Sequence, residues 1–358
     1  MPDLIPTGYT LFKQDLEHVS SQLESDLNQL REAHIFITGS TGFFGIWLLE
    51  SLLWANQRFS LNLRLTALSR DPENFLSKRA DHLRDRKELE FISGRLTNFG
   101  YPSAACTHII HAASEANIEQ SSDWAKRHID TAIFGTRRLL DMAAMHQSEA
   151  ILITTSGAVY SSMDSISNHL CVEGPEGVND YALERIVYGQ SKRMMEIMTS
   201  VDAQHYGYRA LIARCFAFIG PYLPIDSNYA IGNFIRDGLT KSDIIIEGDG
   251  TPLRSYLYAA DLVIWLIRIL TRGSSGMPYN VGGDKSISIR ELAQIVAKLS
   301  GTKVVTKRRP VTDANPSIYL PSLERSFNEL NLQAFVPLEV AIQRTFRWHQ
   351  MQTASLRK

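Results

Sequence analysis

The chain has 358 residues, of which 44% are hydrophobic and 21% are charged, and its formal net charge is -1. This length and composition are typical of a globular protein with one large α/β domain, or a large and a small one. Because the net charge is close to zero, no global field favours nucleic acid or an anionic membrane as a partner.

The cysteines and the apolar segments bear on location. Cys106, Cys171 and Cys215 are far apart and form no C-x-x-C pair, which favours a reduced, cytoplasmic compartment. The longest apolar run, over 262–267, is followed directly by Arg268 and is too short to span a bilayer. We therefore expect a cytoplasmic protein without a membrane segment.

Residues 9–33 carry leucine and valine at helical spacing, which predicts an amphipathic helix ahead of the first strand. We interpret this helix as an extension that packs on the rest of the chain. A helix that binds a partner is the alternative interpretation.

A glycine-rich turn follows at the first expected strand. The mostly apolar residues 34–38 lead directly into Gly39, Gly42 and Gly45, and an apolar helical pattern covers 46–53. Gly39 would allow the sharp turn, Gly42 the approach of backbone to a pyrophosphate, and Gly45 the packing of helix on strand. The amides at the helix start would face the phosphates. The turn therefore predicts dinucleotide binding, with an ordinary turn as the alternative.

The second expected strand, over 61–68, ends where dinucleotide-binding folds carry a residue for the adenosine ribose. Ser69 and Arg70 stand there, a hydroxyl and a cation that suit the phosphate of NADP(H). This modestly favours NADP(H) over NAD. Asp71 keeps NAD possible, and a solvated loop arginine is the alternative interpretation of Arg70.

Strands and helices then alternate along the chain. Further strands are expected over 89–93, 107–113, 150–155 and 209–214, and helices over 124–145 and 184–204. This alternation predicts a parallel sheet covered by helices on both faces. After Arg214, glycine and proline become frequent, which indicates a smaller region over the carboxyl ends of the strands, where open α/β sheets bind ligands.

A tyrosine and a lysine carry the strongest sign of catalysis. Tyr188 and Lys192 are one helical turn apart, so the ammonium can reach the region of the phenol. A nearby cation favours the phenolate, which would make Tyr188 a general acid and base near neutral pH. Ser156 follows the fifth strand and offers a hydroxyl to a substrate oxygen. A surface pair and a plain strand-end turn are the alternatives, but the order of the motifs favours catalysis.

As an ordered set, these motifs resemble those of the extended short-chain dehydrogenases/reductases, and specifically the NAD(P)-dependent nucleotide-sugar epimerase/dehydratase family. The resemblance covers roughly residues 34–350. The matching segments are 38–45, 111–113, Ser156 with Tyr160, Tyr188 with Lys192, 214–221, 248–256 with Asp261, and 279–282.

The resemblance implies an α/β fold with a Rossmann-type, doubly wound parallel sheet and a smaller C-terminal substrate-binding region. The expected parts are a helical extension over 1–33, an NAD(P)-binding domain over 34–215 with returning segments near 255–282, and a nucleotide-sugar-binding region over 216–358. The family further implies NAD(P) as cofactor, a nucleotide-diphosphate sugar as substrate and a homodimer formed through the helices near 124–145 and 184–204.

The resemblance also implies a set of site residues, and no metal. Arg254, whose planar fork suits phosphate, and Asn233 would hold the diphosphate; a loop salt bridge is the alternative for Arg254. The expected catalytic residues are Ser156, Tyr188 and Lys192. The expected cofactor-binding residues are Gly39, Thr41, Gly42, Phe43, Phe44, Gly45, Ser69, Arg70, His111, Ala112, Ala113, Tyr188 and Lys192. The expected substrate-binding residues are Ser114, Ser156, Gly157, Asn233 and Arg254.

The chain departs from the family at several positions. Family dehydratases and decarboxylases carry an acid after the serine or threonine, whereas here Gly157 and Ala158 cannot transfer protons; Glu115 is an alternative acid. Three further positions differ: Arg95 stands where the family often has Asp, Ala217 where it often has Asn, and Ser255 where it usually has Asp.

The missing acids favour 4-epimerisation or reduction of a 4-keto sugar over dehydration, and redox chemistry at sugar C4 of the 4-epimerase type is our leading hypothesis. The alternatives are an NADPH-dependent 4-keto-sugar reductase, and then a 4,6-dehydratase or decarboxylase. A reductase of non-nucleotide substrates and a non-catalytic NAD(P)-sensing scaffold are the remaining hypotheses.

Overall fold

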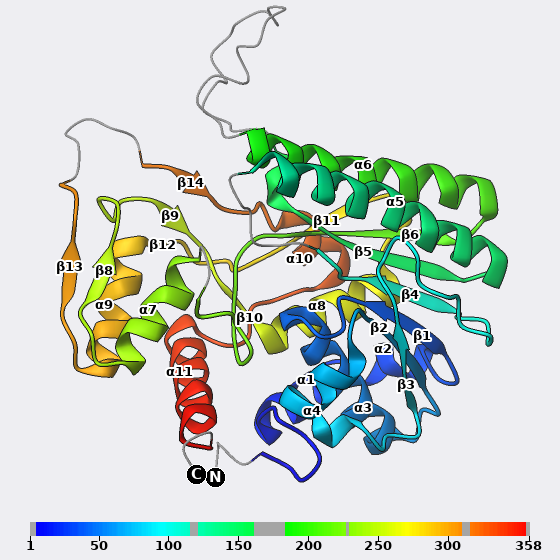
Figure 1. Cartoon of the computed structure of the whole chain (residues 1–358), viewed down its shortest axis with the longest axis horizontal. Coiled ribbons are helices and arrows are strands. Elements are labelled where there is room, and N and C mark those ends of the chain that lie inside the picture. Colours follow the sequence, from blue (N-terminus) through cyan, green and yellow to red (C-terminus); the bar gives the residue numbers. More distant parts are fainter. Residues whose placement is uncertain (1–4, 115–120, 161–182, 227–228, 310–315, 356–358) are drawn as a thin grey trace, which may run out of the picture.

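The computed structural model describes residues 5–114, 121–160, 183–226, 229–309 and 316–355. Its centre is a seven-stranded sheet in the order β11-β6-β5-β4-β1-β2-β3, and every pairing in it is parallel (Figure 1). The strands are β1 (His34–Thr38), β2 (Arg64–Ser69), β3 (Leu89–Ser93), β4 (His108–His111), β5 (Ala150–Ser156), β6 (Arg209–Cys215) and β11 (Pro278–Val281). The predicted doubly wound α/β class is confirmed.

Two strands are shorter than the sequence predicts. The strand expected over 61–68 begins at Arg64, because Asn62 has a left-handed backbone with a φ of 57°. The strand expected over 107–113 ends at His111.

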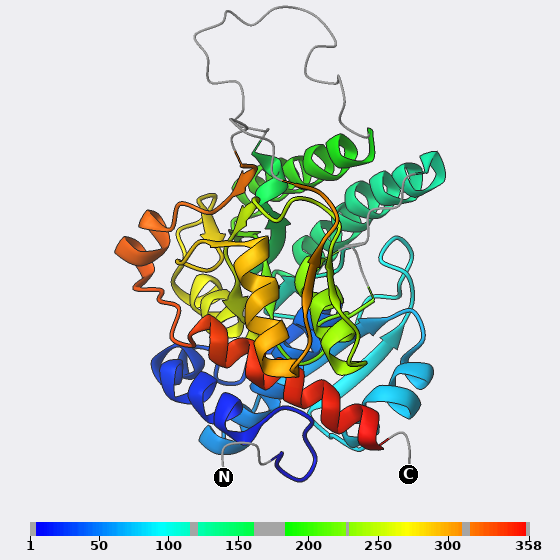
Figure 2. The same ribbon diagram turned by 90° about the vertical axis from the view of Figure 1, so that its left-hand side faces the viewer.

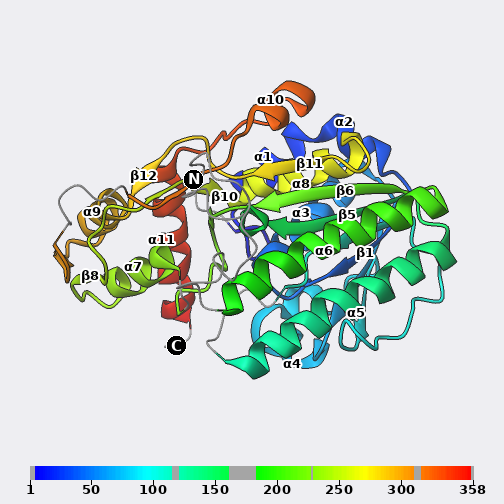
Figure 3. The same cartoon turned by 90° about the horizontal axis from the view of Figure 1, so that it is seen from above.

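Alternate residues of the strands enter two separate cores, one on each face of the sheet. Ile35 and Ile37 of β1 belong to one core and Phe36 to the other. The first face is covered by α3 (Phe43–Phe59) and α8 (Ala259–Arg272), and the second by α5 (Ser122–His146) and α6 (Leu183–Tyr206) (Figures 1 and 3). This two-sided cover explains why the central strands are apolar throughout rather than alternating.

The N-terminal segment forms two helices, α1 (Lys13–Gln22) and α2 (Glu24–Gln29), where the sequence predicts one over 9–33. Both pack on α8, and α1 also packs on α3. Asp26 is fully buried, and its carboxylate lies 2.6 Å from Arg272 Nε and 3.4 Å from Arg268 Nε. These contacts fit the interpretation of this segment as a packing extension.

Most of the smaller elements lie on the side where the large sheet's strands end (Figures 1 and 3). Helix α11 runs across α7 and α9 there (Figures 1 and 2). Two small sheets have two strands each: β7 (Phe218–Ile219) pairs with β10 (Leu257–Tyr258), and β8 (Ile244–Ile246) pairs with β13 (Val304–Thr306). A third sheet has three strands, with β9 (Leu253–Arg254) between β12 (Ile287–Ser288) and β14 (Ile318–Tyr319). The helices are α7 (Ala230–Leu239), α9 (Ile289–Ser300), α10 (Glu324–Leu330) and α11 (Leu338–Ser355), while α4 (Pro72–Arg79) follows β2; short 3-10 turns are η1 (Asp81–Leu83) and η2 (Gly157–Val159). Within the described ranges, no helix has the length and apolar character needed to cross a membrane.

Candidate active site

The turn between β1 and α3 places a helix N-terminus at the carboxyl edge of the sheet. Gly39 has a φ of 69°, and a Cβ added there would lie 2.7 Å from the backbone of Ala112 and Ala113, so glycine is required. A Cβ on Gly45 would collide with the carbonyl oxygen of Gly39. Gly42 is the N-cap of α3 and has no side chain to cap the first amides. This cradle fits the phosphates of a dinucleotide.

Beside the turn, the chain after β4 lies against Gly39 through the backbone of Ala112 and Ala113. His111 instead points into the interior, where its Nδ1 lies 2.8 Å from Thr38 Oγ1 and its Nε2 lies 3.3 Å from Thr136 Oγ1. Burial, reinforced by the charge of Lys192, lowers the pKa of His111 to about 3. The imidazole is therefore neutral, and it ties β4 to its neighbours rather than facing the turn.

At the end of β2, Ser69 is buried and its Oγ accepts a hydrogen bond from the backbone amide of Asp71 at 3.2 Å. The carboxylate of Asp71 caps α4 by accepting from the amide of Asn74 at 3.0 Å. Arg70, between them, is exposed. The carboxylate that kept NAD possible in the sequence is thus engaged as a helix cap.

Ser156, Tyr188 and Lys192 come together at the end of β5. Ser156 is the last residue of that strand, and the other two lie one turn apart on α6, which packs on β5. The Tyr188 phenol lies close enough to the Ser156 side chain for the serine to influence its pKa, and Lys192 Nζ lies 6.0 Å from the centre of the tyrosine ring. Lys192 Nζ also donates to the carbonyl oxygen of Thr154 at 3.2 Å. The structure therefore brings together the three residues expected to be catalytic.

Burial governs the protonation of this pair. Loss of water raises the pKa of the Tyr188 phenol above its usual value of 10, while hydrogen bonding to Ser156 and Ser114 acts in the opposite direction. Burial likewise lowers the pKa of Lys192 to about 8. The sequence predicts a lowered tyrosine pKa, but desolvation of the phenol outweighs its neighbours and the pKa is raised.

A small cavity beside the pair is lined by Lys192, Ser114 and His128, among others. The His128 ring stacks on Trp124 with 4.8 Å between centroids and tilts against the Tyr188 ring at 5.3 Å. Its Nε2 is buried and makes no hydrogen bond to the part of the chain that the structure describes. Burial lowers the pKa of His128 to about 4, so the ring is neutral. Sequence reasoning missed this residue, whose only signal is its place one turn after Trp124.

The residues expected to hold the diphosphate come from two elements. Arg254 lies on β9 opposite Tyr319 of β14, and its guanidinium is 5.9 Å from the centre of the tyrosine ring. Its Nη1 donates to the carbonyl oxygen of Ser317 at 3.1 Å. Asn233 lies in the first turns of α7, where its Oδ1 accepts from Arg236 Nη1 at 3.1 Å. Both side chains thus have protein partners at the positions described.

Tyr319 is the second residue that sequence reasoning missed. A Cβ on Gly157 has its nearest contacts at 2.6 Å from the Tyr319 hydroxyl and 2.7 Å from the ring of Phe216, so glycine makes room for both. Burial raises the pKa of Tyr319 to about 12, against hydrogen bonding with Ser156. A phenol from a strand late in the chain therefore fills the space beside Ser156. Glu115, the alternative acid, lies outside the described residues.

Two of the three cysteines, Cys106 and Cys215, are free and buried, and Cys171 lies outside the described residues. Where the chain is described, no three His, Cys, Asp or Glu side chains are grouped so that they could hold a metal ion.

Comparison with known proteins gives matches over most of the chain. The model of the NAD dependent epimerase/dehydratase family matches residues 35–282. UDP-glucuronic acid decarboxylase 1 of Arabidopsis thaliana is 24% identical over 318 residues, which are 88% of this chain and 69% of that protein.

Two solved structures share the fold. Epimerase Mth375 of Methanothermobacter thermautotrophicus has a TM-score of 0.75 at 19% identity, covering 94% of this chain and 98% of its own. The Bordetella bronchiseptica enzyme WbmF, in complex with NAD+ and UDP, has a TM-score of 0.72 at 18% identity, covering 92% and 96%.

Proposed function

Because the chain belongs to the NAD dependent epimerase/dehydratase family, we propose that it oxidises and reduces C4 of a nucleotide-diphosphate sugar, as a 4-epimerase. The observation that carries this proposal is the assembly of Ser156, Tyr188 and Lys192 on neighbouring elements, at the edge of the sheet that also holds the glycine cradle. A bound nicotinamide would supply the hydride acceptor and donor.

In the proposed reaction, Tyr188 moves the proton. As the general base it takes the proton of the C4 hydroxyl while a hydride leaves C4, so that a carbonyl forms there; the positive charge of an oxidised nicotinamide nearby would offset the burial that raises the pKa of this phenol. Ser156, which lies beside Tyr188, donates to the same oxygen. Lys192, with its ammonium buried one turn along α6, would hold the ribose of the cofactor. In the return step Tyr188 gives the proton back, and reduction on the other face of the sugar completes the epimerisation.

A 4-keto-sugar reductase using NADPH is the second candidate. The raised pKa of Tyr188 keeps the phenol protonated, which suits a proton donor to a ketone. The exposed Arg70 beside Ser69 favours the 2'-phosphate of NADP(H), and on this basis we keep NADP(H) modestly ahead of NAD.

Dehydration and decarboxylation rank lower, although related proteins are named UDP-glucuronic acid decarboxylases. Neither Gly157 nor Ala158 has a carboxyl group, and the Tyr319 hydroxyl occupies the space beside Gly157. A non-catalytic NAD(P)-sensing scaffold has no need of the assembled Tyr188 and Lys192. A reductase of non-nucleotide substrates has no use for Arg254.

The test is to incubate the purified protein with NAD+, NADP+, NADH or NADPH and a panel of UDP-, dTDP- and GDP-sugars, including 4-keto sugars, and to follow products by NMR. We expect a 4-epimer whose formation needs only catalytic amounts of dinucleotide. Stoichiometric oxidation of NADPH with a 4-keto sugar, and no epimer from any other sugar, would assign the reductase instead.

A variant pair separates an enzyme from a sensor. Tyr188→Phe is expected to lose turnover by at least about 100-fold, the usual contribution of a general acid and base, while it still binds dinucleotide. Tyr101→Phe is the matched control, because it removes a phenol hydroxyl that donates to the carbonyl oxygen of Arg138. Equal activity of the two variants would refute the role of Tyr188.

We also propose a homodimer formed through α5 and α6. These helices lie side by side on one face of the molecule (Figure 3) and leave large apolar side chains exposed. The exposed side chains are Ile129, Phe134, Met145, Met194, Ile197 and Val201. Light scattering should show a dimer that Phe134→Glu converts to a monomer; a wild-type monomer would contradict the proposal. The cytoplasmic location stays a prediction from the cysteine content.

A further inference from the structure

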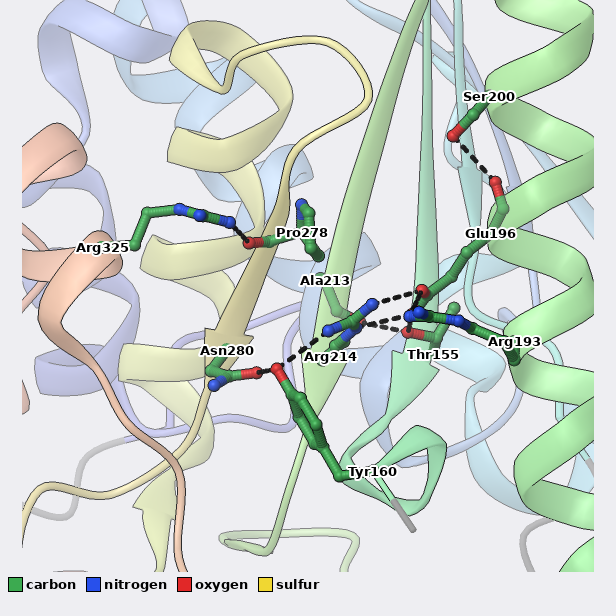
Figure 4. Close-up of polar contacts among 10 residues, drawn as sticks. All are labelled: Thr155, Tyr160, Arg193, Glu196, Ser200, Ala213, Arg214, Pro278, Asn280 and Arg325. Carbon is green, nitrogen blue, oxygen red and sulfur yellow. Dashed lines mark hydrogen bonds and ion pairs between the residues drawn. The ribbon is translucent and has the colours of Figure 1, made fainter. Parts of the chain in front are cut away.

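A buried carboxylate, that of Glu196 (Figure 4), belongs to α6 four residues after Lys192 and therefore lies one helical turn further along the same face. Glu196 Oε1 accepts from Thr155 Oγ1 at 2.8 Å and from Arg214 Nε at 2.9 Å, and its Oε2 accepts from Arg214 Nη2 at 2.6 Å. The three residues are at most 7% exposed. Such a two-pronged pair between a guanidinium and a carboxylate fixes orientation as well as distance.

Arg214 extends this network to the chain that follows Ser156 (Figure 4). Its Nη1 donates to the Tyr160 hydroxyl at 2.9 Å, and its guanidinium lies 4.9 Å from the centre of the Tyr160 ring. The Tyr160 hydroxyl in turn donates to Asn280 Oδ1 of β11 at 2.9 Å. Residues on both sides of Ser156 are therefore tied to one ion pair.

We propose that Glu196 and Arg214 are positioning residues that set the separation of Ser156 and Tyr188, with Thr155 and Tyr160 as their two anchors. This inference rests on the proposed function, since it assigns the network to that site. Ser156 belongs to β5 and Tyr188 to α6, so neither element by itself fixes the distance between the two hydroxyls.

The geometry couples the two halves of the site. Tyr188, Lys192 and Glu196 follow one another at intervals of four residues, so they project from the same side of α6. A shift of α6 along or away from β5 would lengthen the Thr155–Glu196 bond together with the Ser156–Tyr188 distance. The network thus holds the helix in the one register that keeps both catalytic hydroxyls together.

Stability alone is a weak reason for such a pair. Two buried charges lose so much hydration that apolar side chains of similar volume often stabilise a fold equally well. Helix α6 already packs on α5, β5 and β6. The ion pair therefore contributes direction and register to a contact that packing already stabilises.

The experiment changes the anchors, because removing Glu196 would leave the buried guanidinium of Arg214 without its carboxylate and endanger folding. Thr155→Val deletes the hydroxyl and keeps the shape. The matched control is Thr199→Val, on α6, whose fully buried hydroxyl donates within its own helix, to the Met195 carbonyl oxygen. Thr155→Ser restores the hydroxyl.

With the nucleotide sugar that the wild type converts, Thr155→Val is expected to lose kcat by about 10- to 100-fold, the effect of misplacing reacting groups by up to about 1 Å. In Thr155→Val, the KM for the sugar and the Kd for dinucleotide should stay within about twofold of the control, and the melting temperature should match that of Thr199→Val. Thr155→Ser, which keeps a hydroxyl, should recover most of kcat. Tyr160→Phe, compared with Tyr101→Phe, is also expected to lower kcat while KM stays unchanged. The loss of kcat should be smaller than in Thr155→Val, since Tyr160 is 43% exposed and lines an open cleft. An unchanged kcat in Thr155→Val, or a loss that follows the melting temperature of both Thr→Val variants, would overturn the proposal.

Crystal structures of the wild type, Thr155→Val and Thr199→Val decide the matter independently of turnover. A longer Ser156 Oγ to Tyr188 Oη distance in Thr155→Val alone supports the positioning role, and an unchanged distance overturns it. If the wild type converts no nucleotide sugar, the proposed function fails, while this comparison still shows whether the network sets the geometry.

Discussion

Replacing Lys192 by methionine should stabilise the protein while abolishing its activity. Lys192 is 2% exposed, and burial lowers its pKa from 10.5 to about 8. A difference of one in pKa corresponds to about 1.4 kcal/mol, so the buried ammonium costs the folded state about 3 kcal/mol at neutral pH. Methionine fills a similar volume without the charge, although the Thr154 carbonyl oxygen then loses a donor.

The pH dependence of this difference is the sharper test. Below about pH 8 both the folded and the unfolded wild type carry the proton, so the full cost is present. Between about pH 8 and 10.5 the unfolded chain holds the proton and the folded chain releases it, so the stability of the wild type rises with pH. The advantage of Lys192→Met should therefore shrink by about 2 kcal/mol between about pH 7 and about pH 9.5.

Urea unfolding of both proteins without dinucleotide, at a series of pH values from about 7 to 9.5, measures this difference. Groups distant from Lys192 cancel between the two proteins, and the coupled His111 and His128 are already neutral in this range. If the difference in the free energy of unfolding between Lys192→Met and the wild type does not change with pH, or grows as the pH rises, then Lys192 is not a desolvated charge that destabilises the folded protein. Activity measured alongside should be lost in Lys192→Met, as is common where a site is held at a cost in stability.

Three further changes test other parts of the structure. Gly39→Ala should destabilise the protein and abolish dinucleotide binding as measured by calorimetry, because the added Cβ would lie 2.7 Å from backbone atoms. The control is Gly207→Ala, which has a similar φ of 85° but open space around it and should lower the free energy of unfolding by only about 1 kcal/mol. Asp26→Ala should lower the free energy of unfolding by about 3–5 kcal/mol in urea, since it strands Arg268 with its charge buried; a loss below about 1 kcal/mol would contradict this. Arg254→Gln should raise KM for the nucleotide sugar by at least about tenfold and leave the Kd for dinucleotide unchanged, and an equal effect on both would place the arginine elsewhere.

Local patterns predicted the parts of the site that lie within a single element. The three glycines after β1, the one-turn spacing of Tyr188 and Lys192, and the place of Ser156 at a strand end can all be read without the rest of the chain. The alternation of strands and helices predicted the parallel sheet, because each helix that connects two parallel strands must lie on a face of the sheet. Strands covered in this way on both faces are apolar throughout. The break of the N-terminal helix at Leu23 left no sign in the periodicity.

Contacts between distant segments could not be predicted in the same way. Tyr319 reaches Gly157, and Arg214 reaches both Glu196 and Tyr160, only because the fold brings separate strands to one edge.

The protonation of the site also required the structure. In the sequence, Lys192 is a cation one turn from a phenol, which predicts a lowered tyrosine pKa. In the fold both groups are buried, and desolvation raises the pKa of Tyr188 while it lowers that of Lys192. Residue order therefore determined which groups meet along one strand or one helix, whereas tertiary packing decided how much water surrounds them and which distant side chains hold them in place. Solvation and long-range contacts depend on every layer around a site, and no short stretch of sequence contains that information.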